Sequence, residues 1–300
     1  MGLLKDAAFQ IGAGGSAGFV EVCLMHPLDL IKTRFQVQRG PDDPNRYKGL
    51  ADCFVKIYRT EGILSFYKGI LPPILAETPK RATKFFTFEQ YKGLFTCDKL
   101  SLPMTYSFAG LCSGLTEAIV INPFEVVKVR LQTEMAVGLL EQKSAFATAR
   151  EIIKANGFGD AGLNKGLTST LGRHGVWNMI YFGLYHSLKG AYPPPKNNKF
   201  LQDPTANFVH RFSIGFLAGT LASIANIPFD VAKSRIQGPQ PQPGVVKYHG
   251  CFRTIGIIYR EEGFFALYKG LVPKVMRLGP GGAIMLIVYE TVYDFFKRTF

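Results

Sequence analysis

A pattern of five residue types that occurs three times constrains this sequence more than any other feature. Each copy has a proline, an acidic residue two positions later, a lysine three positions after the acid, then an arginine and a glutamine, each two positions further on. The copies begin at Pro27, Pro123 and Pro228, roughly a third of the 300-residue chain apart. Because self-similarity at a fixed period is the signature of a repeat architecture, we predict three copies of one structural unit.

A second motif follows each copy of the first and helps to define the unit. In the first and third copies it is Glu-Gly followed by Lys-Gly, beginning at Glu61 and Glu262. The middle copy departs from this pattern, because Asn156 replaces the acid and two extra residues precede Lys165. We expect three repeats, at residues 1–97, 98–199 and 200–300.

Glycine pairs and uncharged stretches indicate that the repeats lie in a membrane. A G-x-x-x-G pair, which lets membrane helices approach closely, precedes each proline motif and begins at Gly14, Gly110 and Gly215. Residues 100–124 carry a single charge and residues 212–229 carry none, and such stretches are long enough to cross a bilayer.

The predicted fold is all-α and integral to a membrane. Six transmembrane helices form three pseudo-threefold repeats around a central cavity, and each repeat is helix, short helix, helix. The long helices are expected at about residues 9–38, 72–93, 104–132, 168–190, 207–237 and 273–296. The short amphipathic helices are expected at about residues 50–60, 144–155 and 249–260.

Metal and cofactor sites are disfavoured by the spacing of the residues that would build them. The cysteines stand far apart, without C-x-x-C spacing or a nearby histidine, so we expect reduced, structural cysteines and no metal. The stretch 12–17 matches a dinucleotide-binding glycine pattern, but no predicted strand precedes it, so no cofactor is expected. Without a P-loop, a metalloprotease motif or a nucleophile triad, a membrane enzyme is also disfavoured.

The net charge of +13 is compatible with a nucleic acid, an anionic lipid surface or an anionic small ligand, and the distribution of the charge limits the choice. Several of the cations fall within predicted spans, whereas a nucleic-acid binder presents a solvated basic face, so no nucleic-acid partner is expected. The first ten residues lack the features of a secretory signal or a transit peptide. We therefore expect any organelle address to be internal.

Charged residues near the prolines are candidates for a gate. The acid and the lysine of each motif are three residues apart, so they share one helix face. Because charges within a membrane are costly unless paired, we expect them to face the axis and to pair between helices in a ring, braced by the glutamines. Threefold recurrence disfavours the alternative, charged helix ends at a membrane surface. The residues are Asp29, Lys32, Glu125, Lys128, Asp230, Lys233, Gln36, Gln132 and Gln237.

A second, incomplete gate is predicted near the ends of the even-numbered long helices. Its charged members are Glu89, Lys92, Lys189 and Glu290. In this set a histidine, His186, and a tyrosine, Tyr293, stand where a complete ring would carry charges. Snorkelling of these side chains to the membrane interface is the alternative. Because proline interrupts helical hydrogen bonding, hinges are expected at Pro27, Pro123, Pro228, Pro79 and Pro280.

The two motifs, their order and their spacing resemble those of the mitochondrial carrier family over essentially the whole chain. The resemblance implies a six-helix barrel in the inner mitochondrial membrane, with short helices on the matrix side and a cavity that opens alternately to either side. It places the first gate on the matrix side and the second on the cytoplasmic side. It also implies both termini in the intermembrane space, cardiolipin at the ends of the short helices, and a monomer.

Positions that break the threefold pattern are candidates for holding an asymmetric substrate. Seven residues after the glycine of each Lys-Gly pair stand Ala76, Arg173 and Arg277. An arginine fork pairs with a carboxylate through two hydrogen bonds, so cations from different repeats suit the two ends of a short dicarboxylate. The candidate substrate-binding residues are Arg173, Arg277, Lys84, His174 and Lys80, with Glu21 and Glu117 as internal counter-charges for the arginines.

Within the family, four stretches resemble the carriers of 2-oxodicarboxylates, which implies exchange of 2-oxoadipate for 2-oxoglutarate. A carrier of another di- or tricarboxylate, such as citrate or malate, and an anion or proton channel of the same fold are the alternatives. The stretches are residues 69–89, 164–175, 236–241 and 277–282.

Overall fold

The computed structural model describes residues 2–39, 46–96, 100–135, 138–192, 204–242 and 245–299, and every named element in these ranges is a helix. The expected limits between repeats, at 97/98 and 199/200, and Cys97 lie outside the described residues. The other four cysteines are free, as expected.

Each repeat is a long helix, a short helix and a second long helix, as the sequence predicts. Most helix ends agree with the predicted ends within a few residues. The six long helices are α1 (Gly2–Val37), α3 (Leu71–Phe95), α4 (Leu102–Gln132), α6 (Leu167–Ala191), α7 (Pro204–Gln237) and α9 (Leu271–Thr299). The three short α-helices are α2 (Leu50–Glu61), α5 (Ala145–Asn156) and α8 (Cys251–Glu262). Two 3-10 helices, η1 (Ile63–Tyr67) and η2 (Phe264–Tyr268), are not predicted by the sequence patterns.

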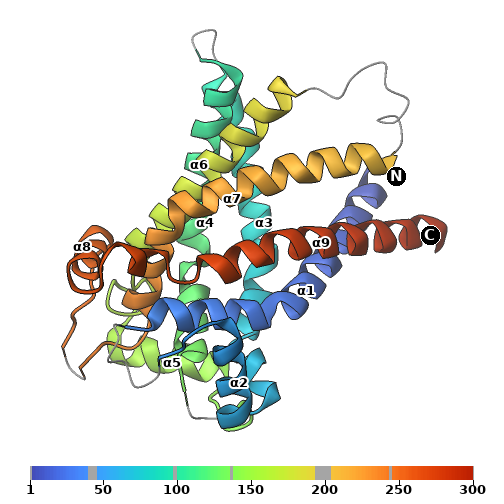
Figure 1. The fold of residues 1–300 in the computed structure, drawn as a ribbon. Coiled ribbons are helices and arrows are strands. Elements are labelled where there is room, and N and C mark those ends of the chain that lie inside the picture. The colour runs from blue at the N-terminus through green and yellow to red at the C-terminus, as the bar shows by residue number, and fades with distance from the viewer. Residues whose placement is uncertain are drawn as a thin grey trace.

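The long helices pack in a closed circuit. Each contacts the next long helix along the chain, and α9 returns to contact α1. Figure 1 shows the two chain termini on one side of the molecule and the short helices α2, α5 and α8 on the other side. We call these two sides the terminal end and the short-helix end.

Three of the described helical stretches are long and apolar enough to cross a membrane: Leu102–Gln132, Val209–Gln237 and Phe264–Thr299. The first two overlap residues 100–124 and 212–229, the stretches with at most one charge that the sequence marks as spans. Large apolar side chains on them, including Ile119, Leu217 and Ile287, are exposed. Such a surface is stable where lipid covers it.

The second motif ends the short helices. Gly62, Gly157 and Gly263 follow α2, α5 and α8 with φ angles of 83°, 69° and 85°, a backbone region that favours glycine. The amide of each donates to the carbonyl four residues earlier, which closes the last turn. The motif therefore fixes where each short helix stops.

Buried apolar clusters attach each short helix to the first long helix of its repeat. In the first repeat, Leu30 of α1 packs with Ile57 of α2 and Phe66 of η1. Corresponding clusters gather around Ile258 and Leu131 in the other repeats. Burying one such side chain contributes about 1.5–3 kcal/mol, so these clusters hold the short-helix end together.

The three glycine pairs do not behave alike, which corrects the expectation of close approach in every repeat. A Cβ at Gly110 would lie 2.8 Å from the carbonyl oxygen of Asn178, so α4 and α6 do pack backbone to backbone. In contrast, a Cβ at Gly14 would meet nothing within 4 Å, and at Gly215 only Tyr181 and Tyr185 side-chain atoms at 3.7 Å or more. The glycine spacing permits close packing, but the splay of the helices at each site decides whether it occurs.

The proposed hinge prolines all lie inside long helices. Pro27, Pro123 and Pro228 fall within α1, α4 and α7, and Pro79 and Pro280 fall within α3 and α9. Each removes a backbone donor from its helix, so each is a point of weaker internal hydrogen bonding.

Candidate functional site

Three ion pairs link the first long helices of the repeats in a ring, near the short-helix end. Each pair joins the lysine of one repeat to the acid of another, so α1, α4 and α7 are each tied to the other two. The pairs, from Nζ to the nearest carboxylate oxygen, are Lys32 to Asp230 at 3.0 Å, Lys128 to Asp29 at 2.9 Å and Lys233 to Glu125 at 2.7 Å. We call these six residues the charge ring.

The charge ring is largely shielded from water. The side chain of Asp230 is 2% exposed and those of the ring lysines are 8–19% exposed. Burying charges is costly, and removing one partner of a buried pair is costlier than removing both. The loss of any one ring residue would therefore leave a costly unpaired charge.

The glutamines of the motif do not brace the ring pairs directly, so that expectation is wrong in detail. Gln132 accepts a hydrogen bond from Thr33 (2.8 Å) and Gln36 accepts one from Ser234 (2.8 Å). Gln237 donates to Asn122 (3.2 Å). Each glutamine lies about one turn beyond the ring lysine of its own helix. It therefore meets a polar residue of the first long helix of another repeat.

The two arginines that break the threefold pattern both contact acids of the charge ring. Arg277 places one Nη atom 2.8 Å from Asp29 and the other 2.8 Å from Glu21. Arg173 forms an ion pair with Glu125 and its Nε lies 3.5 Å from Asp230. The two arginines and the ring thus form two groups of ion pairs, one around Asp29 and one around Glu125 and Asp230, and the ring helices α1 and α4 carry members of both. We call the two groups together the cation network.

Lys274 belongs to this network and is missed by the sequence argument. Its Nζ lies 2.8 Å from Asp230 and also contacts Asn226. Four residues after the glycines of the Lys-Gly pairs stand Pro73, Thr170 and Lys274, so the same comparison of repeats would find it. Every ring acid is thus held by its ring lysine and by cations from the second long helices, one each for Asp29 and Glu125 and two for Asp230.

Only one of the two predicted counter-charges pairs with an arginine. Glu21 contacts Arg277 as expected. Glu117 instead lies 3.1 Å from Nδ1 of His174 and accepts a hydrogen bond from Asn178 (3.2 Å). Glu117 is about two turns before Glu125 on α4, and that separation leaves Glu125, the nearer acid, to Arg173.

The lysines of α3 differ in their surroundings. Lys80 lies 3.5 Å from Glu77, which also pairs with Arg81. Within the part of the chain that the structure describes, Lys84 makes no ion pair, and its Nζ lies 5.1 Å from the ring centre of Trp177. An ammonium over an aromatic face is stabilised without a counter-anion, so Lys84 is available to a carboxylate.

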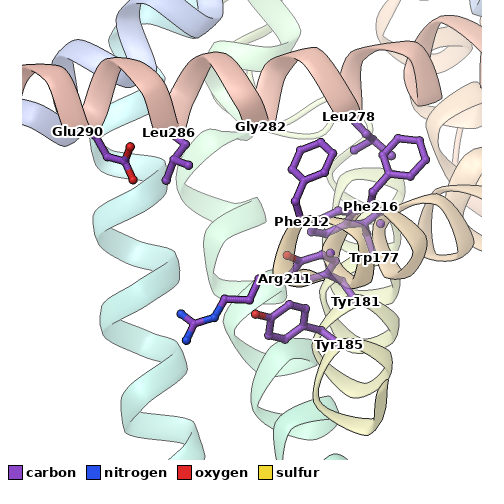
Figure 2. Close-up of a pocket in the computed structure, with 12 residues that line it drawn as sticks. Trp177, Tyr181, Tyr185, Arg211, Phe212, Phe216, Leu278, Gly282, Leu286 and Glu290 are labelled. Atoms are coloured by element: carbon purple, nitrogen blue, oxygen red, sulfur yellow. The ribbon is translucent and has the colours of Figure 1, made fainter. Parts of the chain in front are cut away.

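A cavity of about 660 Å³ lies between α6, α7 and α9. Figure 2 shows Trp177, Tyr181 and Tyr185 of α6 on one wall and residues of α9 on another. Trp177 and Tyr181 stack at 4.7 Å, and the indole Nε1 donates to Ser223 (3.3 Å). The cavity thus has a largely apolar and aromatic lining, to which Arg211 and Glu290 add charge.

The predicted second gate is not closed between helices. Glu89 and Lys92 form an ion pair within α3, three residues apart. Among the described residues, Lys189 and Glu290 make no ion pair, and His186 stacks on Tyr106 with ring centres 3.6 Å apart. Among the described residues, the four charges of the predicted second gate therefore form no ion pair between helices.

A family model described as mitochondrial carrier protein matches residues 5–99, 101–195 and 204–300. The chain belongs to the mitochondrial carrier family. A human protein named mitochondrial 2-oxodicarboxylate carrier is 61% identical over 296 residues, which cover 99% of this chain and 97% of that protein. Saccharomyces cerevisiae has a mitochondrial 2-oxodicarboxylate carrier 2 that is 39% identical, covering 96% and 94% of the two chains. An Aspergillus niger mitochondrial citrate transporter D is 40% identical, covering 97% and 94%.

Membership of this family makes the chain a transporter rather than an enzyme. Together with the apolar helices, it makes the chain a multi-pass protein of the inner mitochondrial membrane. The mitochondrial carrier resemblance seen in the sequence motifs is confirmed.

Proposed function

We propose that this carrier exchanges C5–C7 2-oxodicarboxylates, 2-oxoadipate for 2-oxoglutarate, across the inner mitochondrial membrane. The observation that carries the proposal is the arginine pair, Arg173 and Arg277, which comes from two repeats and belongs to the cation network. Two guanidinium forks suit the two carboxylates of one short chain. The 61% identity to the human 2-oxodicarboxylate carrier supports the substrate class.

The proposed architecture is a barrel of six membrane-spanning helices with pseudo-threefold symmetry, built from repeats at residues 1–97, 98–199 and 200–300. The closed circuit of long helices and the three matches of the family model support it. In this orientation the short-helix end faces the matrix and both termini lie in the intermembrane space.

The charge ring, with its three glutamines, serves as the matrix gate. In the state described, all three interhelical pairs are formed, which ties the matrix side shut. The prolines of the same helices, with Pro79 and Pro280 of the even helices, act as hinges at which the helices bend when the ring opens.

Substrate opens the matrix gate by competing for its cations. Arg173 and Arg277 hold ring acids in the state described. A substrate carboxylate that binds either guanidinium removes a cation from the ring acid that this arginine contacts. The pair between that acid and its ring lysine is then weakened. A ligand shifts a conformational equilibrium only by its differential affinity for the two states, and this competition supplies it.

The remaining candidates complete the substrate site. Lys84 adds a third cation, and His174 offers a hydrogen bond to the 2-oxo group or a carboxyl oxygen. Lys80 extends the positive surface along α3. The aromatic wall of Trp177 and Tyr181 contacts the methylene chain, because apolar pockets favour each added methylene.

The charged residues of the terminal end form the cytoplasmic gate in the opposite state. Glu89, Lys92, Lys189 and Glu290 lie on α3, α6 and α9, which would have to converge for these charges to pair. Since Glu89 and Lys92 now pair within their own helix, closure exchanges a weak local pair for pairs between helices. We further propose a monomer with cardiolipin at the ends of the short helices.

Uptake of labelled 2-oxoglutarate into liposomes tests the proposed function. Purified carrier is reconstituted into vesicles loaded with 2-oxoadipate, citrate, malate, ADP or buffer. Fast uptake against internal 2-oxoadipate, with little uptake into buffer-loaded vesicles, is expected. Uptake into buffer-loaded vesicles would indicate a channel, and uptake only against citrate or malate would assign a different carboxylate carrier.

A further inference from the structure

In the first repeat, one carboxylate neutralises two cations that belong to the two sequence motifs. Glu61 accepts hydrogen bonds from both Nη atoms of Arg34 and from Lys68. Arg34 also donates to the carbonyl of Gln132, at the end of α4. Burial raises the pKa of Glu61, but the bonds from these cations outweigh it and lower the pKa below its usual value.

The third repeat builds the same junction. Glu262 contacts Arg235 at 2.8 Å and Lys269 at 2.8 Å. Arg235 donates to the carbonyl of Gln36, at the end of α1 (2.7 Å). In both repeats, therefore, the acid of the second motif orients an arginine, and that arginine donates a hydrogen bond to the end of the first long helix of another repeat.

The second repeat keeps both cations but lacks the acid. Arg130 and Lys165 stand at the arginine and lysine positions, and Asn156 stands where the acid belongs. Within the described residues, neither cationic side chain makes a hydrogen bond or an ion pair. Pro239 lines a cavity together with Arg130, but its carbonyl accepts a hydrogen bond from Arg39 of the first repeat (3.0 Å). The junction lacks one negative charge.

A cavity of about 170 Å³ lies where that charge is missing. Arg130, Lys165 and Asn156 line it, together with the hydroxyl-bearing Thr148. Glu151 also faces the cavity, but it pairs with Lys143 at 2.7 Å. Burial and the nearby Arg130 lower the pKa of Lys165, which is the expected effect of a second cation close to a half-buried ammonium.

We infer that this cavity binds a phosphate group, which completes the second repeat as Glu61 and Glu262 complete the others. A guanidinium fork, an ammonium, an amide and a hydroxyl supply more donors than one carboxylate accepts, and a tetrahedral phosphate matches such a set. Inorganic phosphate and the phosphate of a lipid headgroup share this chemistry. The bound group ties the end of α4 to the turn before α6.

Thermal unfolding of the purified carrier in detergent tests this site. Inorganic phosphate is compared with chloride at equal ionic strength, for the wild type and for Asn156→Glu and Asn156→Gln. Phosphate is expected to raise the melting temperature of the wild type and of Asn156→Gln by about 2 °C or more. In Asn156→Glu the introduced carboxylate occupies the site, so the melting temperature without phosphate is higher and the shift is smaller.

Phosphate bound in the central cavity would shift all three proteins equally, and equal shifts would overturn the inference. If Asn156→Glu does not fold, Lys165→Gln replaces it, and a full phosphate shift in that variant would overturn the inference instead. A second arm adds cardiolipin or phosphatidylcholine in place of phosphate. A cardiolipin shift lost in Asn156→Glu assigns a lipid phosphate, whereas a shift with inorganic phosphate alone assigns the free anion. No shift with either would refute the site.

Discussion

The two ends of the carrier use similar residues in different ways. At the short-helix end, three lysines and three acids pair between helices and are mostly buried. At the terminal end, Glu89 and Lys92 pair along a single helix, and the side chain of Glu89 is 62% exposed. The energetic weight of a charge pair depends on this difference, because buried pairs are costly to break and exposed pairs contribute little.

The difference matters for the proposed function because a candidate substrate residue contacts the buried ring. Arg277 places its two Nη atoms 2.8 Å from Asp29 of the ring and 2.8 Å from Glu21. A ligand that binds this guanidinium would therefore act on the ring directly.

Reversing a ring charge should have the largest effect. In Asp230→Lys, three cations that now surround one carboxylate would face a fourth cation. An uncompensated buried charge costs about 3–5 kcal/mol, so exchange in liposomes is expected to fall by more than about 100-fold. Glu89→Lys, at the other end, removes only an exposed pair in the state described, so its melting temperature should stay within about 2 °C of wild type, whereas that of Asp230→Lys should fall by about 10 °C or more. Equal drops in melting temperature would contradict the contrast between the ends.

Removing the acid that holds the third repeat together should come next. Glu262→Gln leaves Arg235 and Lys269 without their carboxylate and should lower the melting temperature by about 10 °C. Glu261→Gln removes a neighbouring exposed pair with Lys247 and should change it by no more than about 2 °C. A similar drop in both variants would show that burial does not set the effect.

The same pair has a predictable pH dependence. Although burial raises the pKa of Glu262, hydrogen bonds from Arg235 and Lys269 lower it overall. A lowered pKa in the folded state contributes stability above the unfolded value, about 4.3, and this contribution is lost as the pH falls further. The difference in melting temperature between wild type and Glu262→Gln should therefore shrink as the pH falls through and below that value.

Replacing the fork of Arg277 by an ammonium should have an intermediate effect. Arg277→Lys keeps the charge but cannot hold two carboxylates with separate Nη atoms. A loss of about tenfold in exchange efficiency is expected, equivalent to about 1.4 kcal/mol. Arg298→Lys, the same substitution near the end of α9, is the control and should match wild type. Unchanged exchange by Arg277→Lys would mean that only charge is needed there.

Neutralising the local pair at the terminal end should have the smallest effect on stability. Glu89→Gln removes an exposed pair three residues apart, worth about 0.2–0.5 kcal/mol, so the melting temperature should change by about 1 °C. A drop comparable with that of Glu262→Gln would show that the terminal end is also closed by charge pairs.

The helices could be predicted because local chemistry decides them. Glycines such as Gly62 stop the short helices through their backbone conformation, and the uncharged stretch around Gly215 can only be a buried or membrane helix. The charge ring could be predicted in the same way, because a three-residue spacing puts Asp29 and Lys32 on one face and repetition supplies the partners.

Contacts that depend on how helices are rotated and splayed could not be predicted. Glu117 pairs with His174 rather than Arg173 because Glu125 lies nearer to that guanidinium, and no spacing rule ranks the two acids. Gly14 and Gly110 each begin the same pattern, but only Gly110 is pressed against another backbone. Lys274 could have been found from the sequence by comparing the repeats four residues after the Lys-Gly glycines.

The central claim is that substrate opens the ring end by taking its arginines. Spin labels at Lys154 of α5 and Arg253 of α8, two exposed positions on short helices, would report their separation in a cysteine-free carrier reconstituted in lipid. Adding 2-oxoadipate should shift or broaden the distance distribution in the otherwise wild-type carrier but not in Arg277→Ala. An unchanged distribution in the former, or the same change in both proteins, would contradict the account.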